Sequence, residues 1–201
     1  MTAIVLDKVD EKKRRFLIVA TSAAGAVAAG GVAVPFLGSW FPSARALAAG
    51  APVEVDVSKI EAGQQITVEW RGKPVWILRR TPEMLAQIEK NDGFLADPQS
   101  KSSRQPEYVK GAARSIKPEV FVAVGVCTHL GCSPTLKKEV GAASDMGADW
   151  PGGYYCPCHN SRFDLSARVF KGAPAPTNLE IPPHRYASDG LVVVGEDTKG
   201  A

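Results

Sequence analysis

The sequence lacks a strong net charge, an internal repeat and a large number of cysteines. Its 24 Lys and Arg against 21 Asp and Glu leave a formal net charge of +3, too small an excess to predict nucleic acid as a partner. No internal repeat is apparent among the 201 residues, a length that allows one ordinary domain and an appendage. Four cysteines, counted alone, do not identify the compartment, although a structural disulfide would favour an oxidising one.

Charge is also absent from one long stretch near the N-terminus, between Phe16 and Ala44. The stretch exceeds the roughly 20 apolar residues that a membrane-spanning helix needs. It follows a basic run at 12–15, and such a flank is expected to stay in the cytoplasm. We therefore predict a cytoplasmic N-terminus over residues 1–15 and a single transmembrane anchor of the inner membrane over 16–39. The remainder of the chain is then expected on the periplasmic side.

A cleaved signal peptide is the alternative for the same stretch. Ala44-Arg45-Ala46 has the small-x-small form of a cleavage site, and Arg14-Arg15 before an apolar run resembles a twin-arginine export signal. A cleaved apolar region usually spans about 7–15 residues, which is shorter than this one. The length therefore favours a retained anchor that is exported by the twin-arginine route.

Residues 40–52 are small, with prolines near both ends, and are predicted to form a hinge or linker. The head, residues 53–201, is predicted to be mainly β, because short apolar or alternating runs recur along it. We expect a helix from Pro82 to about Asn91, since proline is favoured in the first turn and Asn-Asp-Gly ends a helix. Strands are expected at 53–57, 66–70, 75–78, 120–126, 179–181 and 191–194. Residues 96–118 hold more Lys and Arg than Asp and Glu, and we interpret them as a solvated loop rather than a contact for an acidic partner.

All four cysteines and two of the three histidines fall in two short motifs, Cys127-Thr128-His129-Leu130-Gly131-Cys132 and Cys156-Pro157-Cys158-His159-Asn160-Ser161. Thiolate with imidazole is the ligand mix of zinc, or of an iron–sulfur centre in which histidines replace two cysteines. Two loops that share a metal site would also bring one cysteine of each within disulfide range, which needs Cα atoms within about 7 Å. A disulfide between the two loops has no obvious role in a structural zinc site.

The paired motifs closely resemble the signature of the Rieske iron–sulfur proteins, C-T-H-x-G-C followed by C-P-C-H-x-S, and match it at every defined position. The resemblance implies an antiparallel β head with a smaller cluster-binding subdomain, at about 121–185, that holds one [2Fe-2S] cluster. Histidine ligation makes such a cluster less negative and raises its reduction potential. The implied roles are Cys127 and Cys156 on the inner iron, His129 and His159 on the outer iron, and a disulfide between Cys132 and Cys158.

The chain as a whole resembles the Rieske subunit of cytochrome bc1 complexes, with anchor, hinge, head and a Gly-x-Pro-Ala-Pro run at 172–176 that is similar to the proline loop of quinol-oxidising members. The resemblance implies that His159 is the catalytic ligand that hydrogen-bonds quinol. It also implies that Leu130, Gly131 and Pro174 lie at the tip of the quinol site.

The implied function is oxidation of quinol, by coupled electron and proton transfer at the outer quinol site. The electron would pass to cytochrome c1, and the step would contribute to the proton gradient. Cytochrome b, cytochrome c1 and ubiquinol are the implied partners, in a dimeric bc1 complex. Two other functions stay open at this point: the Rieske small subunit of a periplasmic oxidase similar to arsenite oxidase, and a Rieske-type ferredoxin. A structural zinc module is a third.

Several further residues carry specific expectations. Ser161 is implied to donate a hydrogen bond to a bridging sulfide. Phe163 stands where many members have a tyrosine whose hydroxyl bonds a ligand sulfur, which predicts a lower potential. Asn160 replaces the usual glycine and is expected to adopt a left-handed backbone, which asparagine tolerates better than most residues. His184 lies outside both motifs and is expected to be an ordinary histidine.

Overall fold

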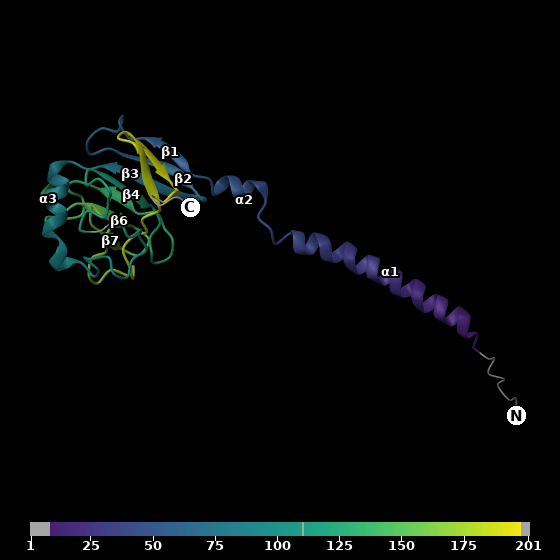
Figure 1. The fold of residues 1–201 in the computed structure, drawn as a ribbon. Helices are drawn as coiled ribbons and strands as arrows, with labels where there is room; N and C mark the ends of the chain where they lie inside the picture. The colour runs from purple at the N-terminus through teal and green to yellow at the C-terminus, as the bar shows by residue number, and fades with distance from the viewer. Residues whose placement is uncertain (1–8, 110, 198–201) are drawn as a thin grey trace, which may run out of the picture. The chain divides into compact units, whose positions relative to one another are not determined.

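The computed structural model describes residues 9–109 and 111–197. The chain divides into two compact units between Leu47 and Ala48, and each is described by itself (Figure 1). The first eight residues of the predicted cytoplasmic segment, Lys110 of the basic loop and the last four residues of the head lie outside the described part.

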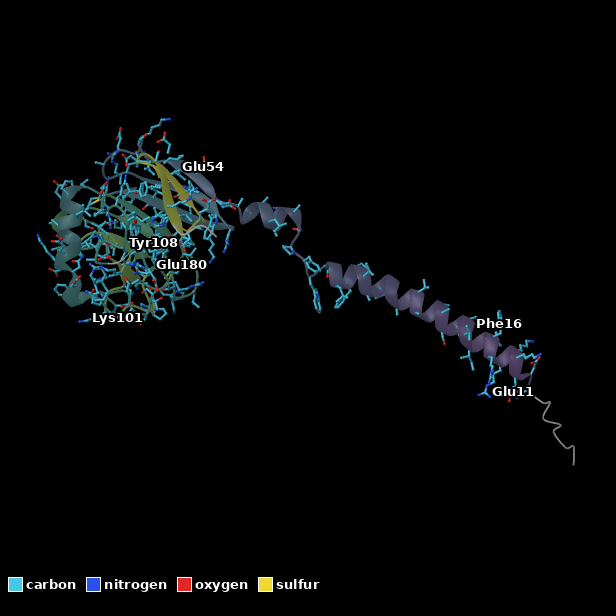
Figure 2. All side chains as sticks on the ribbon, in the orientation of Figure 1. Glu11, Phe16, Glu54, Lys101, Tyr108 and Glu180 are labelled. Atoms are coloured by element: carbon cyan, nitrogen blue, oxygen red, sulfur yellow. A yellow bond between two sulfur atoms is a disulfide. The ribbon has the colours of Figure 1, made fainter. Side chains whose placement is uncertain are left out.

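The N-terminal unit is built around α1 (Glu11–Gly38), a helix of 28 residues. The Asp10 side chain accepts hydrogen bonds from the backbone N–H groups of Lys12 and Lys13, which begins the helix before the apolar run. At 1.5 Å per residue the helix is about 42 Å long. None of its residues is buried, and Figure 2 shows Glu11 and Phe16 projecting from it. In the described part of the chain, α1 is the one helix long and apolar enough to cross a membrane.

A second helix, α2 (Ala44–Ala49), lies within the predicted linker. The Ser43 hydroxyl accepts a hydrogen bond from the backbone N–H of Ala46 at 3.2 Å, so the helix has a polar cap at its start. The segment 40–52 therefore contains a short helix, which its composition of small residues and prolines did not indicate.

The head consists of three antiparallel sheets of three strands, which confirms the mainly β prediction. In the first sheet, β1 (Val53–Asp56) pairs with β9 (Leu191–Val194), which pairs with β8 (His184–Ser188). The second sheet orders β2 (Gln65–Trp70), β3 (Lys73–Arg79) and β4 (Val120–Val124). The third orders β5 (Thr135–Lys137), β6 (Gly153–Cys156) and β7 (Ser161–Phe163). The helical elements are α3 (Pro82–Lys90) and two 3₁₀ turns, η1 (Asp92–Phe94) and η2 (Gly141–Ala143).

Two hydrophobic cores lie in the head. One is formed mainly by strands of the first two sheets, and the other joins α3 and the second sheet to the motif-bearing third sheet. Trp76 of β3 stacks on Tyr154 of β6, with ring centroids 4.8 Å apart, and so connects the last two sheets. A Cβ at Gly125 would lie 2.3 Å from the Trp76 ring, so only glycine fits directly after β4.

The predicted strands and helix agree with the structure except in two places. The Thr81 side chain accepts a hydrogen bond from the Met84 N–H at the start of α3, and the helix ends before Asn91, as expected. The strand predicted at 120–126 ends at Val124. The strand predicted at 179–181 is wrong. Leu179 and Ile181 are buried, but their N–H groups bond to two unrelated segments, Ala167 and Arg104, instead of one partner strand.

The interpretation of residues 96–118 as a solvated loop holds for exposed residues such as Lys101 and Arg104 and is wrong for the buried ones. Arg114 is fully buried, and so is Val109. The Arg114 guanidinium bonds to the carbonyl oxygens of Ser166, Ala167 and Leu179. The charge of Arg114 is therefore used inside the head, which the sequence pattern of the loop did not indicate.

Candidate metal centre

The two motifs are positioned by β4 and by the β6–β7 hairpin. The first motif begins at Cys127, shortly after β4 ends. In the hairpin, Cys156 is the last residue of β6, Ser161 is the first of β7, and the two pair across the ladder. The residues between them form the loop that carries Cys158 and His159. Because the strand pair fixes where this loop leaves the sheet, the hairpin sets the position of the second motif.

A tight turn closes the first motif. The Gly131 N–H donates to the Cys127 carbonyl at 3.0 Å, and the Cys127 N–H donates to the Cys132 carbonyl at 2.8 Å. Gly131 has a φ of 86°, a left-handed conformation that favours glycine. These constraints fix the backbone on both sides of His129 and Leu130.

Asn160 ends the loop of the second motif with a φ of 61°, which confirms the expected left-handed backbone. The Tyr155 hydroxyl donates a hydrogen bond to the Asn160 side-chain oxygen. The asparagine thus takes the place of a glycine and also ties the loop to β6. This contact with Tyr155 had no signal in the sequence.

The predicted disulfide between Cys132 and Cys158 is present, with a Cα–Cα distance of 6.6 Å. It joins the two motifs across 26 residues of chain. Neither residue is available as a ligand, although the sulfur of Cys156 lies within 4.8 Å of both disulfide sulfurs. The disulfide therefore lies directly beside the remaining thiols.

The other two cysteines, Cys127 and Cys156, are buried and free. Burial raises the pKa of the Cys156 thiol, which is hydrogen-bonded to the Cys127 thiol, and this neighbour raises it further. The backbone N–H groups of Cys158 and His159 act in the opposite direction by donating to the sulfur. Two buried thiols in contact are a donor pair for a soft metal centre.

The two histidines of the motifs, His129 and His159, lie in contact with each other. Their rings are perpendicular, with centroids 4.7 Å apart. The Nδ1 atom of His129 is buried and has no hydrogen-bond partner among the described residues. An unpartnered buried ring nitrogen is costly unless it binds a ligand, so Nδ1 is the atom expected to face a metal. Two thiols with two imidazoles fit the Rieske type of [2Fe-2S] cluster.

The apex formed by the motifs is exposed and partly apolar. Leu130 is 70% exposed. His159, Gly131 and Pro174 are exposed as well. The predicted tip residues therefore lie at the surface, as a docking site requires.

Ser161 is fully buried, and its hydroxyl oxygen accepts a hydrogen bond from the Ala175 N–H at 3.1 Å. Because the oxygen serves as acceptor there, the hydroxyl proton remains free to donate. The Thr128 hydroxyl donates to the Thr177 carbonyl at 2.7 Å. Each motif is thus bonded once to the proline loop, 172–179.

Beneath the site lies a group of buried polar residues that sequence reasoning missed. Arg80, Arg114 and Arg168 are each at most 3% exposed, as is Asp164. Arg168 forms ion pairs with Asp164 at 2.8 Å and with Asp92 at 2.6 Å. The other two arginines bond mainly to backbone carbonyls. Their positions depend on contacts between distant segments, for which the sequence carries no local signal.

His184 is a buried histidine whose Nδ1 lies 2.9 Å from the Pro182 carbonyl. Burial lowers its pKa. It belongs to β8, and the structure gives it contacts with Tyr108 rather than with the motifs. This agrees with the expectation of an ordinary histidine.

Comparisons with known proteins match this geometry. Residues 51–183 match the model of the Rieske [2Fe-2S] domain. Residues 7–43 match a model described as the TAT signal of the ubiquinol–cytochrome c reductase Fe-S subunit. The N-terminal helix is thus the signal and membrane-anchor segment of such a subunit.

Two similar relatives are both named ubiquinol-cytochrome c reductase iron-sulfur subunit. The protein of Allochromatium vinosum is 58% identical over 96% of this chain and 93% of its own. That of Blastochloris viridis is 40% identical over 94% and 96%. A solved structure titled hyperthermophilic respiratory Complex III is 26% identical, with a TM-score of 0.46 over 87% of this chain and 97% of that chain.

The match of the N-terminal segment to the signal model of this subunit favours it over the other functions left open by the sequence. Both relatives are matched over nearly their whole length, which also identifies the chain as such a subunit. The chain belongs to the family of Rieske iron–sulfur subunits of ubiquinol–cytochrome c reductase, the bc1 complex.

Proposed function

We propose that the chain's exposed apex accepts electrons and protons from quinol within the bc1 complex and delivers the electrons to cytochrome c1. The observation that carries this proposal is the joint exposure of Leu130 and His159 in the two motifs that also hold two buried free thiols. An apolar contact next to an imidazole suits a substrate that has an apolar ring and a hydroxyl group.

The proposed ligands are Cys127 and Cys156 on the inner iron, with His129 and His159 on the outer iron. When bound, the [2Fe-2S] cluster supplies one-electron chemistry at a potential that histidine ligation raises. The buried, unpartnered Nδ1 of His129 supports ligation through that atom. The second ring nitrogen of each histidine then stays available for a proton.

The chain's own residues bind and orient the quinol. His159 accepts the hydroxyl proton of quinol through its free ring nitrogen, as a general base within hydrogen-bond reach. Leu130, Gly131 and Pro174 form the apolar contact that excludes water from this bond. Ser161, whose proton is free to donate, stabilises the negative charge that reduction adds beside it.

The membrane arrangement is part of the same proposal. The head lies on the periplasmic side of the inner membrane, held by a single span, and reaches that side by twin-arginine export. Segment 40–52 acts as the hinge between anchor and head. Cytochrome b and cytochrome c1 are the protein partners, in a dimeric complex, and release of the protons on the outer side contributes to the proton gradient. The segment's short helix, α2, leaves residues 40–43 and 50–52 outside regular helix, and we infer that the motion occurs in these short stretches.

The sharpest test separates docking from cluster assembly. A Leu130→Asp change places a carboxylate, which resists desolvation, at the proposed contact. We expect ubiquinol–cytochrome c reductase activity of the purified complex to fall at least tenfold, while the electron paramagnetic resonance signal of the reduced cluster stays intact. Val140→Asp is the matched control, since Val140 is also an exposed apolar residue of the head, at 49%. Unchanged activity in Leu130→Asp would contradict the proposed apex.

A further inference from the structure

The head contains a cavity of about 840 Å³ that lies outside the candidate metal centre. It is bounded by the end of α3, by η1, by the segment that precedes β6, and by β7 with the residues that follow it. Pockets for small organic ligands span about 300–1,000 Å³. No cysteine or histidine of the two motifs lines this cavity, so it has the size of a ligand site but no part in the proposed reaction.

Aromatic rings form one wall of the cavity. Trp150 and Phe170 line it, with ring centroids 6.3 Å apart and planes tilted by 44°. Trp150 is 4% exposed, and its indole N–H donates to the Lys137 carbonyl at 2.9 Å. This bond fixes the ring before any ligand arrives. Trp150 therefore supports the wall from behind, and the accessible aromatic surface comes from Phe94, which lines the cavity and is 67% exposed, and from the half-buried Phe170.

The rim of the cavity is positively charged. Lys90, Arg162 and Lys171 line it against a single carboxylate, Asp149. Lys171 donates to the Gly93 carbonyl at 2.8 Å. In the described part of the chain, the side chains of Lys90 and Arg162 form no hydrogen bond or ion pair. Free cations around a concave apolar surface select an anion, and a guanidinium suits the paired oxygens of a carboxylate or phosphate.

Asn91 supplies an independent sign of a missing acceptor. This residue lines the cavity and is only 3% exposed. Its side-chain nitrogen is buried and has no hydrogen-bond partner among the described residues. Buried amide donors are nearly always satisfied, so this nitrogen would gain a hydrogen bond if the side chain rotated toward an acceptor in the cavity.

We propose that this cavity binds a small aromatic anion. Its ring packs on Phe94 and Phe170, its carboxylate or phosphate group contacts Arg162 and Lys90, and the Asn91 side chain rotates so that its buried nitrogen donates to one of its acceptor atoms. Because Arg162 belongs to β7, the bound anion touches the hairpin that carries the second motif. The site is independent of the quinol contact at the apex.

The test uses the full-length protein in detergent and 1-naphthyl phosphate as the probe, with binding measured by titration calorimetry. Inorganic phosphate tests whether the aromatic wall contributes. We expect one naphthyl phosphate per chain, bound at least tenfold more tightly than phosphate. Loss of a charge-assisted hydrogen bond in Arg162→Gln, or in Lys90→Gln, should weaken binding by about tenfold. Both side chains are exposed, so neither change endangers folding.

Lys101→Gln is the matched control, because Lys101 is an exposed lysine of the head that does not line the cavity. All variants share the same detergent, so partition of the probe into micelles cancels in the comparison. Equal affinity for phosphate and naphthyl phosphate would overturn the proposal. So would the absence of binding at millimolar probe, or an equal loss of affinity in Lys101→Gln and Arg162→Gln.

Discussion

Replacing Arg114 with methionine should destabilise the head strongly, although the residue lies in a segment whose composition looks solvated. The guanidinium donates to Gln105 at 2.8 Å, to Leu179 at 2.7 Å and to the carbonyls of Ser166 and Ala167. Burial lowers the pKa of Arg114 to about 10, so the side chain stays charged at neutral pH. Each of these bonds is therefore charge-assisted and shielded from water.

The magnitude follows from the acceptors that the change leaves behind. Ala167 keeps the hydrogen bond that its carbonyl accepts from the Leu179 N–H, whereas the carbonyls of Ser166 and Leu179 lose the Arg114 donor. An unsatisfied buried acceptor costs about 1–3 kcal/mol of stability. The variant no longer buries the guanidinium charge, and this gain offsets part of the loss. We expect a loss of about 3 kcal/mol. For a domain of this size that corresponds to a fall in Tm of roughly 6–12 °C.

The assay is thermal unfolding of the full-length protein in detergent, followed by far-ultraviolet circular dichroism. Arg104→Met is the matched control from the same segment. Arg104 has an 83% exposed side chain and a single ion pair with Glu180 at 3.9 Å, so its loss should cost under about 1 kcal/mol. Equal shifts in Tm for the two variants would refute the reasoning and restore the simpler view of a solvated basic loop.

Three further predictions concern the centre and the core. Changing Cys132 and Cys158 together to serine should cost about 3.5 kcal/mol of chain entropy and weaken cluster retention; full occupancy by electron paramagnetic resonance would count against this. Phe163→Tyr should raise the midpoint potential by adding a donor beside the ligand sulfurs, and a redox titration that shows no rise would contradict it. Burial lowers the pKa of His184, so the unfolded chain binds more protons below about pH 6.5 and stability is lost as pH falls. His184→Phe should flatten that loss between pH 7.5 and 5.5, as measured by Tm; an unchanged slope would show that other groups cause it.

The short motifs were predictable because their chemistry and their local backbone are encoded together. The disulfide partners, the left-handed Asn160 and the two remaining cysteines were all implied by the match of the two motifs to the Rieske signature. The start of α3 was predictable for the same reason, since Thr81 and Pro82 act within one turn of helix. In each case the decisive interaction joins residues that are close in sequence or that belong to the two motifs.

The wrong predictions concern interactions between residues that are far apart in the sequence. The segment at 179–181 has the apolar character of a strand, yet the Leu179 N–H bonds to Ala167 and its carbonyl accepts from Arg114. The charge pattern of residues 96–118 carries no information about carbonyl oxygens more than fifty residues away that need a hydrogen-bond donor. The same holds for the pairing of Arg168 with Asp92 across 76 residues. The burial of Arg114 and Arg168 depends on how distant segments pack together, and their neighbours in sequence do not determine it.

The proline loop shows how such distant polar contacts bear on the proposed reaction. The Ala175 N–H donates to Ser161, and Thr177 accepts from Thr128, so one bond from each motif holds the loop. Ser161 is thereby given two tasks, since its oxygen holds the loop while its proton is left for the proposed bond at the centre. A Ser161→Ala change removes both. Ser161→Ala should therefore change the reduction potential and also loosen the proline loop. Thr128→Val should loosen the loop while leaving the Ser161 hydroxyl in place. Comparing the two variants separates the effect of the Ser161 hydroxyl on the potential from its effect on the loop.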